Sequence, residues 1–132
     1  MSSELIGIAA DHGGFALKYA VVAELKALGF EVLDLGTDSE EPVDYPDMAE
    51  TLIEAFKDGR VSRGFLICGT GIGISIAANR HPGIRAALCY DTDTAALARQ
   101  HNDANIMCLG GMRACVRELV GVQVCRCFWY FR

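Results

Sequence analysis

The stretch GFLICGTGIGISIAAN, residues 64–79, contains the transition that decides the fold. It starts with a short apolar run, continues through three glycines in five residues, and ends in an apolar segment with helical spacing. A buried strand that turns through glycines into a helix is a basic unit of parallel α/β proteins. We therefore predict a strand over residues 64–68 and a helix over about residues 72–79.

The same alternation of apolar runs and helical patterns extends to both sides of this stretch. Helices are predicted after Gly14, after the loop 36–44, and after a cap at Asp91 or Thr92. Further strands are predicted at residues 5–10, 31–35, 84–90 and 105–109. Five strands separated by helices, without hairpin signals, predict an α/β fold in which a parallel sheet forms the middle of a three-layer α/β/α sandwich.

The composition indicates one globular domain without a membrane span. The chain has 132 residues, of which 52% are hydrophobic, and no apolar run approaches the roughly 20 residues that a spanning helix needs. The amino-terminal residues lack the pattern of a signal peptide, so we expect a single domain over residues 1–132, located in the cytoplasm. The formal charge of −5 argues against a nucleic-acid partner and means that an anionic ligand needs local donors.

The six cysteines do not form a disulfide or zinc pattern. No two of them are spaced as CxxC, the three histidines are scattered, and Cys125 and Cys127 alone are only a weak metal signal. We expect free thiols and no bound metal. The cysteines lie at positions 68, 89, 108, 115, 125 and 127.

Polar and glycine residues follow the predicted strands, where parallel α/β sheets bind their ligands. Ligands of such sheets bind at the edge where the strands end. His101 and Asn102 lie just before the fifth strand, so this rule does not place them at that edge. The residues that it does place there are Asp11 and His12, residues 68–71, Tyr90 and Asp91, and Gly110 and Gly111.

The loop that begins at Cys68 has the features of an anion site. Gly69, Gly71 and Gly73 let the backbone approach a ligand and turn its N–H groups inward, at the start of a helix. The positive end of a helix dipole and inward N–H groups favour the thiolate form of a cysteine. A thiolate beside backbone donors suits proton abstraction next to a carbonyl. The spacing matches neither the Walker nor the full dinucleotide pattern, and a plain tight turn with a buried cysteine fits it equally well.

Two histidine motifs are further candidates. In the segment DHGG, residues 11–14, Asp11 and His12 could orient sugar hydroxyls and contact a phosphate, with a simple helix cap at Asp11 as the alternative. The segment HND, residues 101–103, suits general acid–base chemistry, although a lone histidine is often a surface or capping residue.

Four ordered blocks together resemble one known family. The likeness runs from about residue 6 to residue 111 and points to the type B ribose-5-phosphate isomerases with the related galactose- and allose-6-phosphate isomerases. The blocks are DHGGF (11–15), VDYPD (43–47), CGTGIGISIAANR (68–80) and RQHNDAN (99–105).

The resemblance implies a cofactor-free aldose–ketose isomerase of the pentose phosphate pathway, with a Rossmann-like five-stranded sheet. It implies a homodimer or homotetramer with sites between subunits. Cys68 would be the base that moves a proton between C1 and C2, because Ile74 stands near the place where some relatives carry a glutamate. The other catalytic residues would be Thr70, His101 and Asp11, and the substrate-binding residues would be His12, Gly69, Gly71, Gly73, Asn102, Tyr45 and Arg113.

From about residue 112 the sequence departs from the family pattern. Relatives carry an arginine directly after the Gly-Gly pair and a later basic stretch that grips phosphate, whereas Met112 precedes Arg113 here and the basic stretch is absent. Two alternatives to a ribose-5-phosphate isomerase therefore stay open. The first is a galactose- or allose-6-phosphate isomerase, since the motifs do not size the sugar, and the second is a catalytically weak phosphosugar-binding protein.

Overall fold

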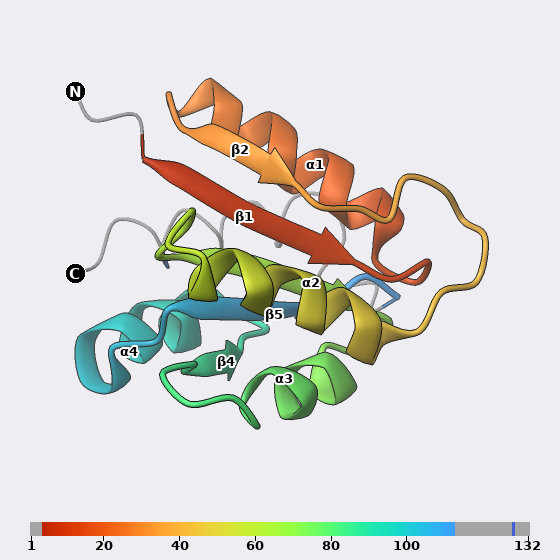
Figure 1. The fold of residues 1–132 in the computed structure, drawn as a ribbon. Coiled ribbons are helices and arrows are strands. Elements are labelled where there is room, and N and C mark those ends of the chain that lie inside the picture. The colour runs from red at the N-terminus through yellow and green to blue at the C-terminus, as the bar shows by residue number, and fades with distance from the viewer. Residues whose placement is uncertain (1–3, 113–127, 129–132) are drawn as a thin grey trace.

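The computed structural model describes residues 4–112 and residue 128 (Figure 1). Strands and helices alternate throughout the continuous part, as the sequence predicts. Arg113 and the rest of the atypical carboxyl-terminal segment, Phe128 excepted, lie outside the described residues. The elements are β1 (Leu5–Ala10), α1 (Phe15–Ala27), β2 (Glu31–Asp34), α2 (Tyr45–Lys57), β3 (Gly64–Cys68), α3 (Ile72–Ala78), β4 (Ala86–Leu88), α4 (Thr92–Asn102) and β5 (Ile106–Gly110).

The five strands form one parallel sheet in the order β2-β1-β3-β5-β4. The chain winds outward from β1 to β2 through α1, and α2 then returns it to β3 on the other side of β1. The boundary between β1 and β3 is therefore the topological switch point, where α/β sheets of this kind bind ligands. The pairing of Ala10 with Ile67, and of Cys68 with Gly110, brings the carboxyl ends of β1, β3 and β5 into line.

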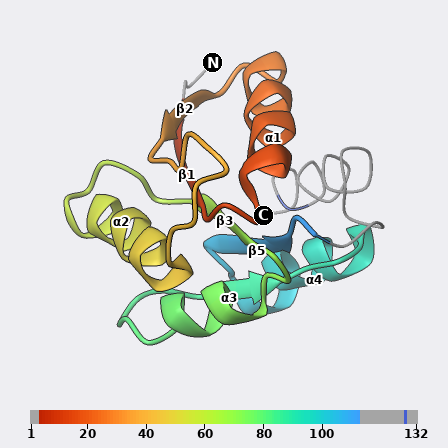
Figure 2. The same cartoon turned by 90° about the vertical axis from the view of Figure 1, so that its right-hand side faces the viewer.

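Helices cover both faces of the sheet (Figure 2). Alternate side chains of β3 show the division: Phe65 and Ile67 pack in the cluster under α1 and α4, whereas Leu66 and Cys68 pack in the cluster under α2 and α3. A strand that is buried on both faces reads as a continuous apolar run, which is why these strands stand out in the sequence. The predicted three-layer α/β/α sandwich is thus confirmed.

Strand β4 is shorter than the predicted strand 84–90, which is a correction. The amide of Ile84 donates to the carbonyl of His81 in a turn, and the amide of Arg85 donates to the side chain of Asn105. Strand β4 also pairs only with β5, because it lies at the edge of the sheet. An apolar run predicts that a strand forms, but not how many residues of an edge strand pair with a neighbour. The apolar run at residues 84–90 therefore overestimates the length of β4.

The helix ends agree better with the sequence. Gly29 follows α1 with a φ of 93°, a left-handed conformation that favours glycine, as predicted for a helix stop. At the start of α4, the carboxylate of Asp91 accepts the backbone N–H of Thr94 at 2.7 Å. This hydrogen bond lowers the pKa of Asp91. None of the helices among the described residues is long and apolar enough to cross a membrane.

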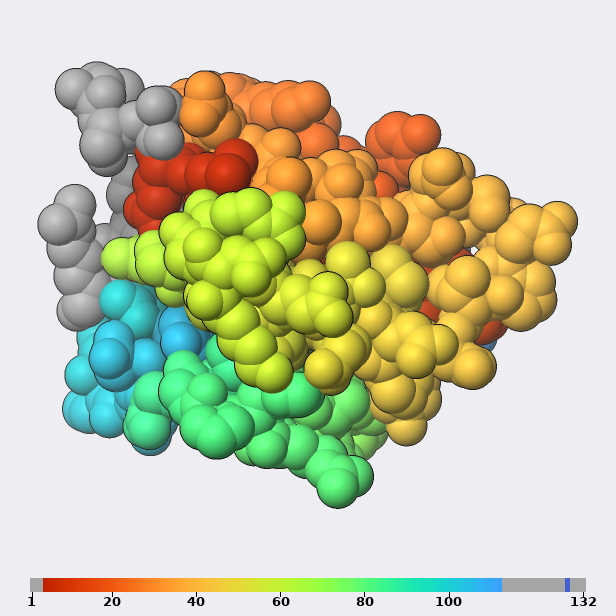
Figure 3. All heavy atoms as spheres, viewed as in Figure 1, coloured from red at the N-terminus to blue at the C-terminus, as the bar shows by residue number. Residues whose placement is uncertain are grey.

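A buried ion pair joins α1 to the end of β2. The side chain of Lys18 is 3% exposed, and its Nζ lies 2.7 and 2.8 Å from the two carboxylate oxygens of Asp34. Asp34 also accepts the backbone N–H of Gly36 at 3.0 Å, so it anchors the start of the loop that leads to α2. In the space-filling view this loop forms one edge of the molecule beside α2 (Figure 3).

Asp34→Ala should lower the free energy of unfolding by about 2–3 kcal/mol, because it leaves the Lys18 ammonium buried without its counter-charge. The expected loss is smaller than the roughly 3–5 kcal/mol of a fully buried pair, since the Asp34 side chain is 43% exposed. Urea denaturation would measure the loss as a lower midpoint at an unchanged slope. In the Asp34→Ala background, Lys18→Met should restore part of the stability. A loss under about 0.5 kcal/mol, which is usual for surface substitutions, would contradict the prediction.

Candidate active site

Three loops follow the carboxyl ends of β1, β3 and β5 and contact one another through their backbones. A Cβ added to Gly111 would lie 2.5 Å from the carbonyl oxygen of Gly13, and one added to Gly13 would lie 3.2 Å from the backbone of Gly69. The amide of Gly111 donates to the carbonyl of Cys68 at 2.8 Å, and the amide of Met112 to the carbonyl of Gly69 at 3.0 Å. Glycines are needed at these crossings because a side chain would separate the loops.

Cys68 ends β3 within this group of loops. Its side chain is 4% exposed, and its Sγ accepts the backbone N–H of Gly71 at 3.1 Å. Gly71 has a φ of 81°, and a Cβ at this position would meet Leu88 at 2.6 Å. A backbone N–H directed at sulfur stabilises negative charge on it, so the geometry suits a thiolate.

Thr70 is exposed on the same loop. Its Oγ1 accepts the backbone N–H of Ile72 at 3.1 Å, and its carbonyl oxygen accepts the hydroxyl of Tyr90 at 2.5 Å. Tyr90 comes just after β4, so the strand-end rule places it at this edge of the sheet. The rule does not predict the contact itself, which depends on side-chain packing.

Asp11 and His12 follow β1 at the same edge. Asp11 is 7% exposed, and its Oδ1 accepts the N–H groups of Gly13 and Gly14 at 2.9 and 3.2 Å. These contacts order the turn before α1, whose cap residue is Gly14 without a side-chain cap hydrogen bond, so Asp11 is not the helix cap that the sequence left open as an alternative. His12 is exposed, with its Nδ1 3.1 Å from the amide nitrogen and 3.2 Å from the carbonyl oxygen of Val43, which leaves Nε2 as the other ring nitrogen for a ligand.

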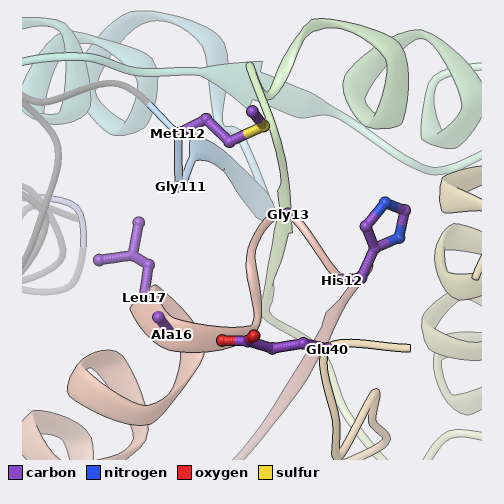
Figure 4. Close-up of a pocket in the computed structure, with 7 residues that line it drawn as sticks. All are labelled: His12, Gly13, Ala16, Leu17, Glu40, Gly111 and Met112. Carbon is purple, nitrogen blue, oxygen red and sulfur yellow. The ribbon is translucent and has the colours of Figure 1, made fainter. Parts of the chain in front are cut away.

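A cavity of about 530 Å³ lies beside His12 (Figure 4), a size that is ordinary for a small-molecule site. Apolar side chains form much of its wall, with the imidazole of His12 and the carboxylate of Glu40 as polar groups. No sequence pattern indicates Glu40, because it belongs to the irregular loop between β2 and α2. The lining residues are His12, Gly13, Ala16, Leu17, Glu40, Gly111 and Met112.

Tyr45 lies at the start of α2 and borders a separate hollow beside the loop that follows β3. A Cβ added to Gly73 would lie 2.7 Å from Cζ of the Tyr45 ring, so this ring packs against the first turn of α3. The tyrosine is 39% exposed. The structure thus brings together eight of the predicted site residues, which are Cys68, Gly69, Thr70, Gly71, Gly73, Asp11, His12 and Tyr45.

His101 and Asn102 lie at the opposite edge of the sheet. They are exposed at the carboxyl end of α4, which runs back from the end of β4 to the start of β5 (Figure 1). The carbonyl of Asn102 accepts the Nε of Arg85 at 2.6 Å. Within one chain these two residues are therefore not brought to Cys68. Arg113, the remaining predicted site residue, lies outside the described residues.

The other two cysteines among the described residues are buried in the sheet and form no disulfide there. Burial raises the pKa of the Cys89 thiol to about 12 and that of Cys108 well above its ordinary value. Both are therefore neutral at physiological pH. Within residues 4–112 and 128, no three histidine, cysteine, aspartate or glutamate side chains are grouped to hold a metal ion.

A parallel α/β domain that gathers a cysteine, an aspartate and a histidine at its switch point has the arrangement expected of a site for a small polar molecule. The model of the Ribose/Galactose Isomerase family matches residues 6–126, and the chain belongs to that family. The predicted family resemblance is confirmed, and the chain is an enzyme of the isomerase class.

Individual relatives agree with this assignment. The chain is 50% identical to ribose-5-phosphate isomerase B of Escherichia coli (strain K12) over 121 residues, which cover 92% of this chain and 77% of the relative. Its structure resembles that of ribose-5-phosphate isomerase B of Clostridium thermocellum, with a TM-score of 0.92 at 46% identity over 97% of this chain and 85% of the other. It also resembles the structure of a ribose 5-phosphate isomerase of Thermotoga maritima, with a TM-score of 0.93 at 45% identity. That likeness covers 98% of this chain and 88% of the other.

Proposed function

We propose that this protein is a cofactor-independent aldose–ketose isomerase that interconverts ribose 5-phosphate and ribulose 5-phosphate in the pentose phosphate pathway. The observation that carries the proposal is the position of Cys68 at the β1/β3 switch point, with a backbone N–H on its sulfur. The names of these relatives support the five-carbon substrate over galactose or allose 6-phosphate.

The chemistry needs one base that serves two neighbouring carbons. In the open-chain aldose, the Cys68 thiolate takes the proton from C2, and the C–H electron pair forms the C1–C2 double bond while charge moves to the C1 oxygen. Backbone N–H groups of residues 69–73 stabilise this enediolate. The proton of the C2 hydroxyl passes to the C1 oxygen, so the negative charge then lies on the C2 oxygen. The thiol returns its proton to C1 while the charge on the C2 oxygen forms the ketose carbonyl, and the thiolate is regenerated.

The neighbouring residues have roles that fit their positions. The Asp11 carboxylate and the Thr70 hydroxyl would contact sugar hydroxyls beside Cys68. His12 borders the cavity and has Nε2 directed away from Val43, which suits a hydrogen bond to the phosphate. Tyr45, packed on Gly73, would close one side of the substrate site.

We also propose that His101 and Asn102 complete the site of a second copy of the chain. Their exposure at the edge away from Cys68 supports this, because within one chain they cannot reach its substrate. The exposed apolar side chains of Tyr45 (39%), Ile72 (49%) and Ile76 (62%) border the Cys68 loop and suit burial against a partner subunit. A homodimer is the smallest assembly that meets this need, and a homotetramer would meet it too.

We further propose that residues 1–132 form one isomerase domain that acts in the cytoplasm, without nucleic-acid or membrane partners. The acidic composition argues against a nucleic-acid partner, and no helix in the part of the chain that the structure describes is long and apolar enough to cross a membrane.

A coupled assay for ribulose 5-phosphate formation tests the proposed function. We expect steady turnover of ribose 5-phosphate and at least roughly tenfold lower kcat/KM on allose 6-phosphate and galactose 6-phosphate, because one extra carbon changes the length that the site must span. Faster turnover of a six-carbon substrate would assign the alternative isomerase activity. Binding of ribose 5-phosphate in calorimetry without turnover would instead indicate a phosphosugar-binding protein.

A further inference from the structure

The peptide bond between Thr70 and Gly71 is held at both of its polar ends. Its carbonyl oxygen accepts the hydroxyl of Tyr90 at 2.5 Å, and its N–H donates to Sγ of Cys68 at 3.1 Å. A single peptide unit therefore connects the Tyr90 hydroxyl to the sulfur. Gly110 of β5 packs directly against this peptide, since a Cβ at Gly110 would lie 2.7 Å from the Thr70 carbonyl. The contact restricts the space in which the peptide can move.

The orientation of this peptide decides which dipole end faces the sulfur. Gly71 has a φ of 81°, and glycine also adopts negative φ readily, so rotation of the preceding peptide by about half a turn is open to the backbone. In the rotated form, the carbonyl oxygen would replace the N–H near Sγ and disfavour negative charge there. A hydrogen bond to the carbonyl opposes this rotation, and it also polarises the peptide so that its N–H becomes a stronger donor.

We propose that Tyr90 is a positioning residue for isomerisation, whose hydroxyl holds the Thr70–Gly71 peptide with its N–H on the Cys68 sulfur and so favours the thiolate. The inference rests on the proposed role of Cys68 as the base. Tyr90 acts through the peptide and has no need to touch the substrate. It belongs to the segment between β4 and α4, so it couples the edge of the sheet to the loop after β3.

Tyr90→Phe tests the proposal in the full chain, because it removes the hydroxyl and keeps the partly buried ring. We expect the rate of Cys68 alkylation by iodoacetamide at pH 7 to fall roughly three- to tenfold, the factor that one ordinary hydrogen bond supplies. Peptide mass spectrometry would follow Cys68 separately from the other cysteines. The kcat for ribose 5-phosphate should fall by a similar factor, with KM within about twofold of wild type.

Tyr19→Phe is the matched control. Tyr19 lies on α1, is 64% exposed and packs edge-on against Phe15, so loss of its hydroxyl should change neither rate. Thermal melts followed by circular dichroism would show that both variants are folded. In the unaltered protein, the Gly71 amide should exchange slowly with solvent deuterium, which gives a measurement that does not depend on any variant.

The alkylation rate, kcat, KM and amide exchange together distinguish a positioning role of Tyr90 from a binding role and from no role. Wild-type alkylation of Cys68 in Tyr90→Phe, or rapid exchange of the Gly71 amide in the unaltered protein, would overturn the positioning role. A large rise in KM without slower alkylation would also overturn it and make Tyr90 a binding residue. Slower alkylation with unchanged kcat would show that Tyr90 acts on the thiol but not on turnover, which would also overturn the positioning role. The proposed function fails separately, if the unaltered protein does not turn over ribose 5-phosphate.

Discussion

Cys68→Ala is expected to lower kcat for ribose 5-phosphate by roughly 10²–10⁴-fold while the chain stays folded, because a missing general base typically costs this factor. The thiol is 4% exposed, and its loss removes a single heavy atom from the cluster under α2 and α3. The cost in stability should therefore stay on the order of 1 kcal/mol. The coupled assay measures the activity, and urea denaturation checks the fold.

Cys89→Ala is the matched control for this prediction. Cys89 is also a buried cysteine, but it packs in the cluster under α1 and α4, and its pKa of about 12 keeps it neutral. The control should retain near-wild-type kcat. Iodoacetamide should inactivate the wild-type enzyme, and ribose 5-phosphate should protect it. A Cys68→Ala variant with near-wild-type kcat would remove this cysteine from the mechanism.

His101→Asn is expected to reduce turnover of ribose 5-phosphate by roughly 10²-fold if this imidazole opens the sugar ring by general acid–base catalysis. Most of the loss should disappear with a four-carbon aldose 4-phosphate, which cannot close a five-membered ring through its phosphorylated terminal oxygen. His101 is exposed at the end of α4, so the substitution should leave stability nearly unchanged. Equal losses on both substrates would favour a binding or structural role.

Mixing the two variants tests whether the site is shared between subunits. A hybrid of Cys68→Ala and His101→Asn chains contains one site with an intact cysteine and an intact histidine. After subunit exchange at equal concentrations, about a quarter of the sites of a symmetric dimer should be intact, and activity should recover to that level. Without recovery in a mixture that demonstrably exchanges subunits, His101 does not act across an interface.

Local patterns in the sequence determine most of the fold. The strand from Gly64 to Cys68, the glycine turn and the start of α3 at Ile72 agree with the prediction from residues 64–79. The reason is that strands buried on both faces and amphipathic helices both require periodic apolar residues, which neighbouring positions display. The rule for strand ends likewise places Asp11, Cys68 and Tyr90 at one edge, because all parallel strands end on the same side.

Contacts between distant segments were decided only by the tertiary structure. The order of the strands, the pairing length of β4 and the Tyr90 hydroxyl on the Thr70 carbonyl depend on packing across the sheet, for which no local periodicity exists. The same holds for Val43, whose backbone contacts His12 across 31 positions of the chain. The sequence by itself determined which polar and glycine residues follow the strands, because apolar runs mark the strands locally. Tertiary packing determined where the edge strand β4 ends and which of these residues meet, and it left His101 at the far edge.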